Sequence, residues 1–333
     1  MEKLRNVILL IATALLLIPL RSNAQTDQQL TQYFEVPSYY NAAAIGQTDK
    51  IRLRAGGRLQ WVGIDHAPKG MLLTADMPLK LFGKRIGVGL MAQSESAGLF
   101  RNLSVNLQAG YKVRLWKGEL TAAVQLGFAN EQFKGSDVFI PEGDDYHDSN
   151  DEAIPKTDLA GNTFDLGAGL FYNHKYFWAG VSGTHLTSPT ITFSDESTSA
   201  GSSTSETTKN YEFQLKRTLY FMGGGNIPIK NTLFEVMPSV LVKSDFTTTR
   251  FELTGRVRYK KFLTFGLGYR HDDAVCAILG AEFKGFFIGY SYDYPITDIS
   301  KASNGSHELI LGYSLKLDLR EKNKNKHKSI RIM

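Results

Sequence analysis

The sequence of 333 residues contains a single cysteine, Cys276. One cysteine excludes an internal disulfide and any metal cluster that needs several thiolates. Cys276 stands in a run in which apolar residues alternate with others, and this setting predicts a buried or membrane-facing strand position, not a reactive thiol.

Long apolar runs are absent after the first residues. Val7 to Leu20 form an apolar stretch, and Ser22-Asn23-Ala24 provides the small residues of a cleavage site, so we expect a cleaved secretory signal peptide over residues 1–24. No later run reaches the ~18 apolar residues of a membrane-spanning helix, which excludes a helical membrane protein. A β-barrel is still possible, because its segments need only about 10 alternating residues each.

A strong excess of one charge is lacking too. The 38 Lys and Arg residues nearly balance the 33 Asp and Glu residues. No basic patch is interleaved with aromatic residues, so nucleic-acid binding is not expected. The chain is instead rich in Gly (31), Phe (20) and Tyr (15), with only 10 Pro, a profile typical of β-rich proteins with aromatic girdles.

Apolar residues recur at every second position in many segments. In residues 103–115, for example, Leu, Val, Ala and Tyr alternate with Asn, Ser, Gln and Lys. A period of two predicts strands with one apolar and one polar face, because a helix would repeat every three or four residues. About fourteen strands, an even number as in closed bacterial barrels, are expected at residues 51–61, 70–80, 85–94, 101–116, 118–133, 162–173, 176–187, 210–223, 231–243, 249–260, 262–271, 274–284, 286–294 and 307–319.

The predicted connections differ between the two ends of these strands. One set is short and basic, as at Lys117-Gly118 and Lys260-Lys261, whereas the other contains long polar stretches at 134–161 and 188–210. Outer-membrane barrels have short periplasmic turns and long outer loops. We therefore predict an all-β fold: a closed antiparallel transmembrane β-barrel over residues 51–319 in the outer membrane, with both chain termini in the periplasm.

Charged residues on the predicted strands would be costly in lipid. Arg52, Arg54 and Arg58 are expected to face the lumen, opposite carboxylates such as Glu252 and Glu308. The outward band would then consist of Leu, Val, Phe, Tyr and Trp.

Three segments outside the strands are candidate interaction sites. The acidic stretch at 134–161 could bind calcium, but it lacks the spacing of an EF-hand loop, so a solvated or partner-contacting loop is favoured. The basic tail at 320–333 is either solvated or docks to an acidic periplasmic partner. Residues 25–50 are aromatic and apolar; we expect them to plug the periplasmic end of the lumen, or to form a partner-facing arm.

A catalytic site is not expected. Ser303 or Ser306 with His307 and Asp298 is the only tempting nucleophilic grouping, and the chain has no G-x-S-x-G elbow, P-loop or H-E-x-x-H motif. Asn304-Gly305 is a tight-turn signal, and Asp, Ser and Asn side chains commonly bond to turn backbone. We predict no catalytic, cofactor or metal residues, and therefore no enzyme.

Four motifs together resemble the PorP/SprF family of type IX secretion and gliding-motility outer-membrane proteins, from about Gln28 to Leu319. They are "LTQYFEVPSYYNAAAIG", "RLQWVGIDHAPKGMLLTADMPL", "FWAGVSGTHLTSP" and "GYSYDYPITDISKASNGSHELILGYS". Ala42 stands where the family usually has Pro. The residues that match the first three motifs are Gln32, Tyr33, Tyr40, Asn41, Gly46, Arg58, Gln60, Trp61, Gly63, Ala67, Pro68, His185 and Leu186.

The resemblance implies a non-enzymatic barrel that works with the secretion machinery. It would anchor periplasmic components or receive secreted cargo through the cargo's C-terminal sorting domain. An outer-membrane porin-like transporter for small solutes or hydrophobic molecules is the alternative. In the fourth motif, the resemblance implies a shaped outer hairpin that offers a partner-contact surface, formed by Asp298, Ser300, Ser303, Asn304, Gly305, Ser306 and His307.

Overall fold

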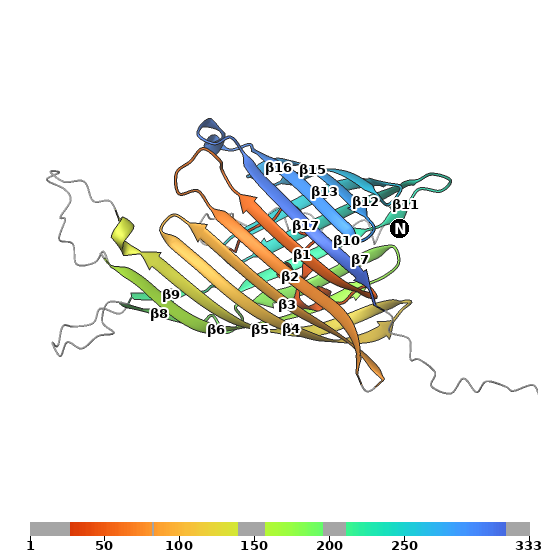
Figure 1. Ribbon diagram of the computed structural model, residues 1–333, viewed down its shortest axis with the longest axis horizontal. Coiled ribbons are helices and arrows are strands. Elements are labelled where there is room, and N and C mark those ends of the chain that lie inside the picture. The colour runs from red at the N-terminus through yellow and green to blue at the C-terminus, as the bar shows by residue number, and fades with distance from the viewer. Residues whose placement is uncertain (1–26, 82, 139–156, 196–210, 318–333) are drawn as a thin grey trace, which may run out of the picture.

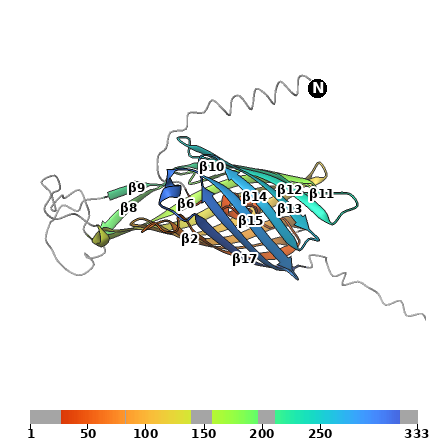
Figure 2. The ribbon, with the colours of Figure 1, turned by 90° about the horizontal axis from the view of Figure 1, so that it is seen from above.

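A computed structural model describes residues 27–81, 83–138, 157–195 and 211–317 of the chain, and these residues form a barrel of antiparallel strands (Figures 1 and 2). The predicted signal peptide, the tail at 320–333 and most of the two long polar stretches lie outside the described residues. Within the described part, no helix has the length and apolar character needed to cross a membrane.

Among the described residues, fourteen strands form a closed ring, because β1 pairs with both β2 and β17. The predicted strand count and closure are thereby confirmed. The ring consists of β1 (Lys50–Leu59), β2 (Lys69–Leu81), β3 (Lys84–Ala97), β4 (Phe100–Leu115), β5 (Gly118–Lys134), β6 (Asp158–Asn173), β7 (Phe177–Thr184), β10 (Thr218–Gly225), β12 (Phe234–Ser244), β13 (Thr249–Tyr259), β14 (Leu263–Arg270), β15 (Ala274–Phe283), β16 (Phe286–Pro295) and β17 (Ser306–Lys316).

A hairpin leaves the ring where one strand was expected over 210–223. β8 (Thr190–Asp195) pairs with β6 beyond the end of β7, and β9 (Tyr211–Gln214) pairs with β8. Ile191 and Phe193 of β8 pack with Leu159 of β6 in a small buried cluster. The predicted strand was therefore wrong in its first half, because Tyr211–Gln214 pair with β8 outside the ring and β10 begins only at Thr218. The remaining short strand, β11 (Ile227–Pro228), pairs with β12.

The two faces of the wall follow the alternation of the sequence. On β4, Leu103, Val105 and Leu107 are 49%, 41% and 60% exposed on the outside, whereas Ser104 and Asn106 are buried on the inside. We call the end with turns such as Lys117-Gly118 the short-turn end. The long-loop end carries the connections 60–68, 135–157, 185–217 and 296–305.

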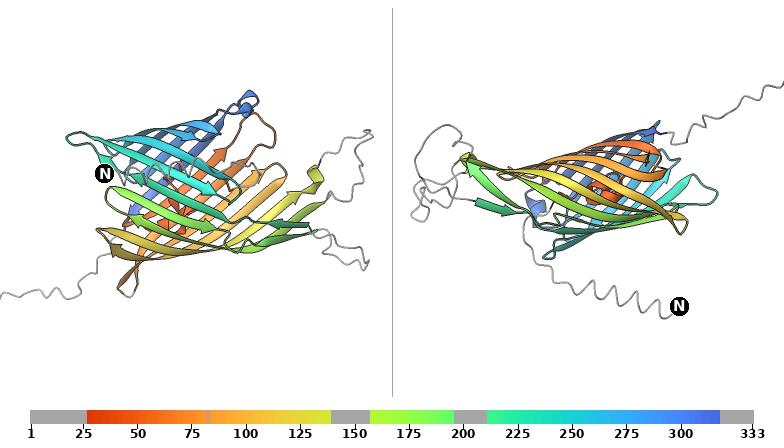
Figure 3. Two further views of the ribbon diagram at one scale, coloured as in Figure 1. Left: turned by 180° about the vertical axis from the view of Figure 1, so that it is seen from behind. Right: turned by 90° about the horizontal axis from the view of Figure 1, so that it is seen from below.

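The remaining elements are short helices. α2 (Pro37–Tyr40) and η1 (Ala42–Ala44) lie in the N-terminal segment, which appears in red within the barrel in Figure 3. η2 (Gly135–Asp137) follows β5, and η4 (Asp298–Lys301) lies in the connection between β16 and β17.

Candidate functional site inside the barrel

Residues 28–46, which we call the lumen segment, occupy the interior of the barrel. Tyr33, Ile45 and Leu30 are at most 2% exposed, and Tyr33 and Tyr40 meet edge to face with ring centroids 6.4 Å apart. Pro37 starts α2, where its missing amide hydrogen costs no helix bond. The segment therefore forms an apolar core together with inward wall residues such as Leu72, Met222 and Ile310.

The lumen segment runs the length of the barrel. Asp27 contacts His185 near the long-loop end, and Lys50 begins β1 at the short-turn end. The sequence predicted a plug at the periplasmic end of the lumen or a partner-facing arm, whereas residues 27–50 extend between both ends of the barrel. The difference arises because polar anchors for it occur along the whole inner wall, and alternation does not reveal which of them it uses.

Two arginines and three carboxylates form the arginine–carboxylate cluster, each side chain at most 2% exposed. Its members are Arg58, Glu252, Arg270, Asp293 and Glu308, from β1, β13, β14, β16 and β17. Arg58 Nη2 lies 2.7 Å from Asp293 Oδ2, and Arg270 Nε lies 2.9 Å from Glu252 Oε2. Burying such charges is tolerable only because they are paired and hydrogen-bonded.

The cluster forms hydrogen bonds with the backbone and a side chain of the lumen segment. The amides of Thr31 and Gln32 donate to the two oxygens of Glu308 at 2.8 and 2.9 Å. The Thr31 hydroxyl donates to Asp293 at 2.8 Å and accepts from Arg270 at 3.0 Å. Since a carboxylate accepting backbone amides is a strong anchor, this is where the segment is fixed most firmly.

Asn41 fixes the middle of the segment. Its side chain donates to the carbonyls of Leu170 and Val181, at 3.0 and 3.2 Å, on β6 and β7. The approach is possible because the facing wall residues are glycines: a Cβ at Gly169 would lie 2.2 Å from Asn41 Oδ1, and one at Gly180 would lie 2.6 Å from Nδ2. Nearer the short-turn end, the Gly46 amide donates to Asp76 Oδ1 at 2.6 Å.

Asp27, just before the lumen segment, is held by ionic contacts at the long-loop end. His185 Nε2 lies 3.3 Å from Asp27 Oδ1, its Nδ1 lies 3.0 Å from Asp165, and Tyr220 donates to Asp27. Burial by itself would lower the pKa of His185, but the charges of Asp27 and Asp165 outweigh it and raise that pKa to about 10. Burial opposes the ionised form of Asp27, yet His185 and Lys243 hold its pKa well below the ordinary value.

The residues of the fourth motif shape their own hairpin. Lys301 Nζ lies 2.7 Å from Asp298 Oδ1, the Gly305 amide donates to Ser303 Oγ at 3.0 Å, and Ser300 lies in η4. Among the described contacts no serine bonds to His307, whose Nδ1 instead lies 2.7 Å from the Tyr290 hydroxyl.

The hairpin is joined to the β1–β2 connection. The Val62 amide donates to the Gly305 carbonyl at 2.8 Å, the Asn304 amide donates to Val62 at 2.7 Å, and the Trp61 amide donates to Ser306 Oγ at 3.1 Å. All family-motif residues except Leu186 therefore gather in two places. The lumen contacts include Gln32, Tyr33, Tyr40, Asn41, Gly46 and Arg58, and His185 joins them through Asp27. The connection beside the hairpin contains Gln60, Trp61, Gly63, Ala67 and Pro68. Leu186 lies on the outer surface.

Sequence reasoning missed several residues of this site. Thr31, Asp165, Arg270 and Asp293 were not singled out, although they hold the lumen segment. Their strand parity could have found the last three, since each is a polar residue on the inner face of an alternating strand. Within the described residues, no group of three or more His, Cys, Asp or Glu side chains is arranged to hold a metal ion.

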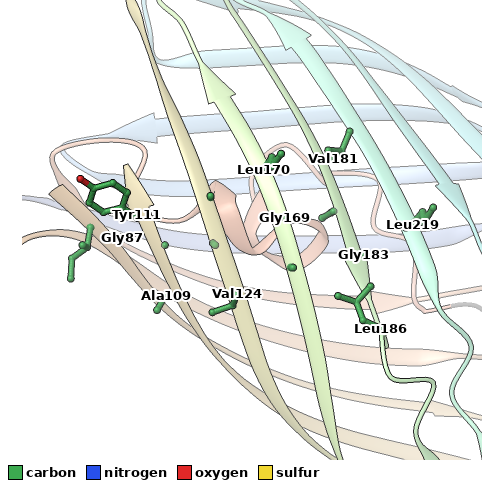
Figure 4. Close-up of a pocket in the computed structure, with 16 residues that line it drawn as sticks. Gly87, Ala109, Tyr111, Val124, Gly169, Leu170, Val181, Gly183, Leu186 and Leu219 are labelled. Atoms are coloured by element: carbon green, nitrogen blue, oxygen red, sulfur yellow. The ribbon is translucent and has the colours of Figure 1, made fainter. Parts of the chain in front are cut away.

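On the outside of β3–β7 and β10 lies an apolar groove of about 770 Å³. Small residues such as Ala109 and Gly183 leave the space for the groove, and Val124, Leu170 and Leu219 surround it. The lumen segment lies behind these strands (Figure 4). The groove is separated from the lumen by the wall.

Residues 22–313 match the sequence profile of a family described as type IX secretion system membrane protein PorP/SprF. No curated protein matches the chain significantly. Among solved structures, the chain is similar to the toluene transporter TbuX of Ralstonia pickettii, with 11% identity, a TM-score of 0.49, and 85% of this chain and 94% of that one covered. It is also similar to a FadL homologue of Pseudomonas aeruginosa (10% identity, TM-score 0.46, 85% and 94% covered) and to the translocator domain of the autotransporter NalP of Neisseria meningitidis (12%, 0.45, 80% and 88%).

Proposed function

The chain belongs to the PorP/SprF family of type IX secretion system membrane proteins and forms an outer-membrane β-barrel, and from this premise we propose that it anchors an acidic periplasmic component of the secretion machinery, without enzymatic activity. The short turns would face the periplasm and the long connections the outside, as is usual for such barrels. Docking would rely on shape and charge.

The lumen segment inside the barrel is the observation that carries this proposal. The lumen segment is anchored to the wall by the arginine–carboxylate cluster, by Asn41 and by Gly46. A barrel whose interior is occupied by a segment of its own chain is suited to bind partners through its exposed surfaces. Passage of solutes would require moving a segment whose polar anchors are buried, which disfavours the porin-like alternative.

The turns at the short-turn end are rich in exposed lysine, and the exposed Asp49 beside them pairs with Arg85. Six exposed lysines, which we call the lysine rim, stand in its turns or beside them: Lys84, Lys117, Lys175, Lys260, Lys261 and Lys284. None of them forms an ion pair within the part of the chain that the structure describes. Lys260 and Lys284 lie over the rings of Tyr259 and Phe283, each 5.2 Å from the ring centroid. An acidic partner fits such a rim.

The test is charge reversal in a deletion strain complemented with variants. Lys117→Glu, Lys260→Glu and Lys284→Glu together should abolish co-purification of a periplasmic partner in mild detergent and reduce export of sorting-domain cargo. The matched control reverses three exposed charges at the long-loop end, Lys216→Glu, Arg217→Glu and Lys301→Glu, and should leave both readouts unchanged.

Outcomes against the proposal are equally defined. Normal export in the deletion strain would remove a role in secretion altogether. Export lost only in the control variant, with exported cargo co-purifying, would favour a cargo receptor that acts through the long-loop end. Unaltered partner binding in the rim variant would exclude docking through the lysine rim.

A further inference from the structure

A second cavity of about 890 Å³ lies across β1–β5, β16 and β17 near the long-loop end. Its lining combines basic side chains, such as Lys69 and Arg101, with apolar ones, such as Leu59, Met71 and Leu309. The apolar members are on the outer face, where Met71 is 73% and Leu309 is 43% exposed. The cavity lies on the outer face, away from the lysine rim, and Arg58 and Glu308 of the arginine–carboxylate cluster also border it.

The basic side chains form a row across neighbouring strands. Lys69 of β2 stands opposite Ser96 of β3, and Ser96 stands opposite Arg101 of β4. Two strand spacings place the backbones of Lys69 and Arg101 roughly 10 Å apart. On β5, Gln132 stands opposite Arg101, and Lys134 lies two residues further along, with its Nζ 3.4 Å from Asp137 Oδ2. Asp65 also lines the cavity.

Lys69 and Arg101 are the two cations available for a ligand. Both side chains are exposed, and neither has an ion-pair partner among residues 27–81, 83–138, 157–195 and 211–317. Ser96 between them supplies a hydroxyl. Arg binds phosphate oxygens through two parallel N–H donors, and Lys binds them as a point charge.

The row lies at the edge of the apolar band. On β4 the outward residues from Leu103 to Val113 are apolar, and they cover about the 9–11 residues that a membrane-crossing strand needs. Arg101 is the next outward position beyond them. On β2, Met71 follows Lys69 in the same way. Cations above and apolar side chains below match a lipid with an anionic headgroup.

We propose that this cavity binds a phosphorylated glycolipid of the outer leaflet, with phosphate on Lys69 and Arg101, sugar hydroxyls near Ser96, and an acyl chain along Met71 and Leu309. The occupant is a glycolipid because the long-loop end faces outward, an orientation that rests on the proposed function. The site is independent of the lysine rim and of secretion itself.

The test uses the full-length protein in nanodiscs of zwitterionic phospholipid doped with bisphosphorylated lipid A. Native mass spectrometry counts the lipid A molecules that the protein retains. Lys69→Gln with Arg101→Gln should lower retention at least about tenfold, since two charge-assisted contacts are lost. The matched control, Lys117→Gln with Lys260→Gln at the short-turn end, should retain lipid A like the wild type.

Two further arms separate the sources of binding. Dephosphorylated lipid A should be retained no better by the wild type than by the double variant. Equal retention of the two lipid A forms, or loss of lipid A in the short-turn control, would overturn the proposal, and so would equal retention of an anionic phospholipid. Labelling of Lys301 on intact cells reports orientation separately: if Lys301 were shielded, the long-loop end would face the periplasm and the glycolipid proposal would fail, whatever the export result.

Discussion

Arg58 of β1 and Glu308 of β17 stand directly opposite each other in the ladder that closes the barrel, and their side chains form a buried ion pair with Nη1 and Oε2 3.3 Å apart. The same carboxylate accepts the backbone amides of Thr31 and Gln32. Glu308 therefore contacts both the strand that closes the barrel and the lumen segment, so seating of the segment is coupled to the seam.

Glu308→Ala should consequently loosen the lumen segment. Glu308→Ala leaves Arg58 with Asp293 alone, a carboxylate that Arg58 shares with Arg270, and removing one partner of a buried pair costs up to about 3–5 kcal/mol. Cys276 is the natural reporter, because it is the only cysteine and is fully buried in the wild type. We expect maleimide labelling of the folded variant to be much faster than that of the wild type. Leu309→Ala, at the neighbouring outward position, is the control, and an equally protected thiol in Glu308→Ala would contradict the coupling.

Gly169 leaves room for Asn41, so a single added methyl group at Gly169 should lower the stability of the barrel. Gly169→Ala places a Cβ 2.2 Å from Asn41 Oδ1, and overpacking of this kind costs about 1–3 kcal/mol. Urea unfolding in detergent micelles, followed by tryptophan fluorescence, measures the loss. Gly255→Ala is the matched control, since nothing lies within 4 Å of its added Cβ. In an Asn41→Ala background the cost of Gly169→Ala should shrink; an unchanged cost would place the strain elsewhere.

The contact between His185 and Asp27 should make stability depend on pH. The folded-state pKa of His185 is raised from 6.5 to about 10, so its contribution is full below about pH 6.5 and is lost as the pH rises through about 10. Asp27, whose pKa is lowered, contributes above its ordinary value of 3.8. The stability difference between wild type and His185→Gln, about 1.5–3 kcal/mol for hydrogen bonds to charged groups, should be largest near pH 6. Thermal unfolding from pH 6 to 10 checks this; a gap that grows with pH would refute it.

The wall of the barrel could be predicted because its outer face meets lipid and its inner face meets polar groups. Lipid outside and polar contacts inside impose a period of two on every strand, so the alternation over 103–115 locates β4 (Phe100–Leu115) closely. Arg58 and Glu308 were expected to face inward for the same reason, and they do. The cost of burying a charge unpaired made the lumen the sole acceptable place for them.

The interior could not be predicted to the same degree. Arg270 and Asp293 meet through side chains from β14 and β16, and Thr31 joins them from far away in the sequence. Alternation says that each faces the lumen, but not which partner it finds there. Likewise, the composition of the lumen segment indicates burial without indicating direction. Those choices are set by long-range packing, which no local pattern records.

Removal of the lumen segment should turn a closed barrel into a pore. The wall does not need residues 28–46 for its strand pairing, because the ring closes through β1 and β17, whereas the interior is occupied by buried side chains such as Tyr33 and Ile45. In planar bilayers we therefore expect little ion current from the wild type and stepwise currents from the protein lacking residues 28–46. Heat-modifiable migration on gels verifies that the deletion variant has folded. If it does not fold, Tyr33→Ala, which removes one buried ring, replaces it, and we expect this variant to give currents smaller than those of an open barrel but larger than those of the wild type. Equal conductance of wild type and both variants would mean that the segment does not seal the lumen. That result would favour the porin-like function.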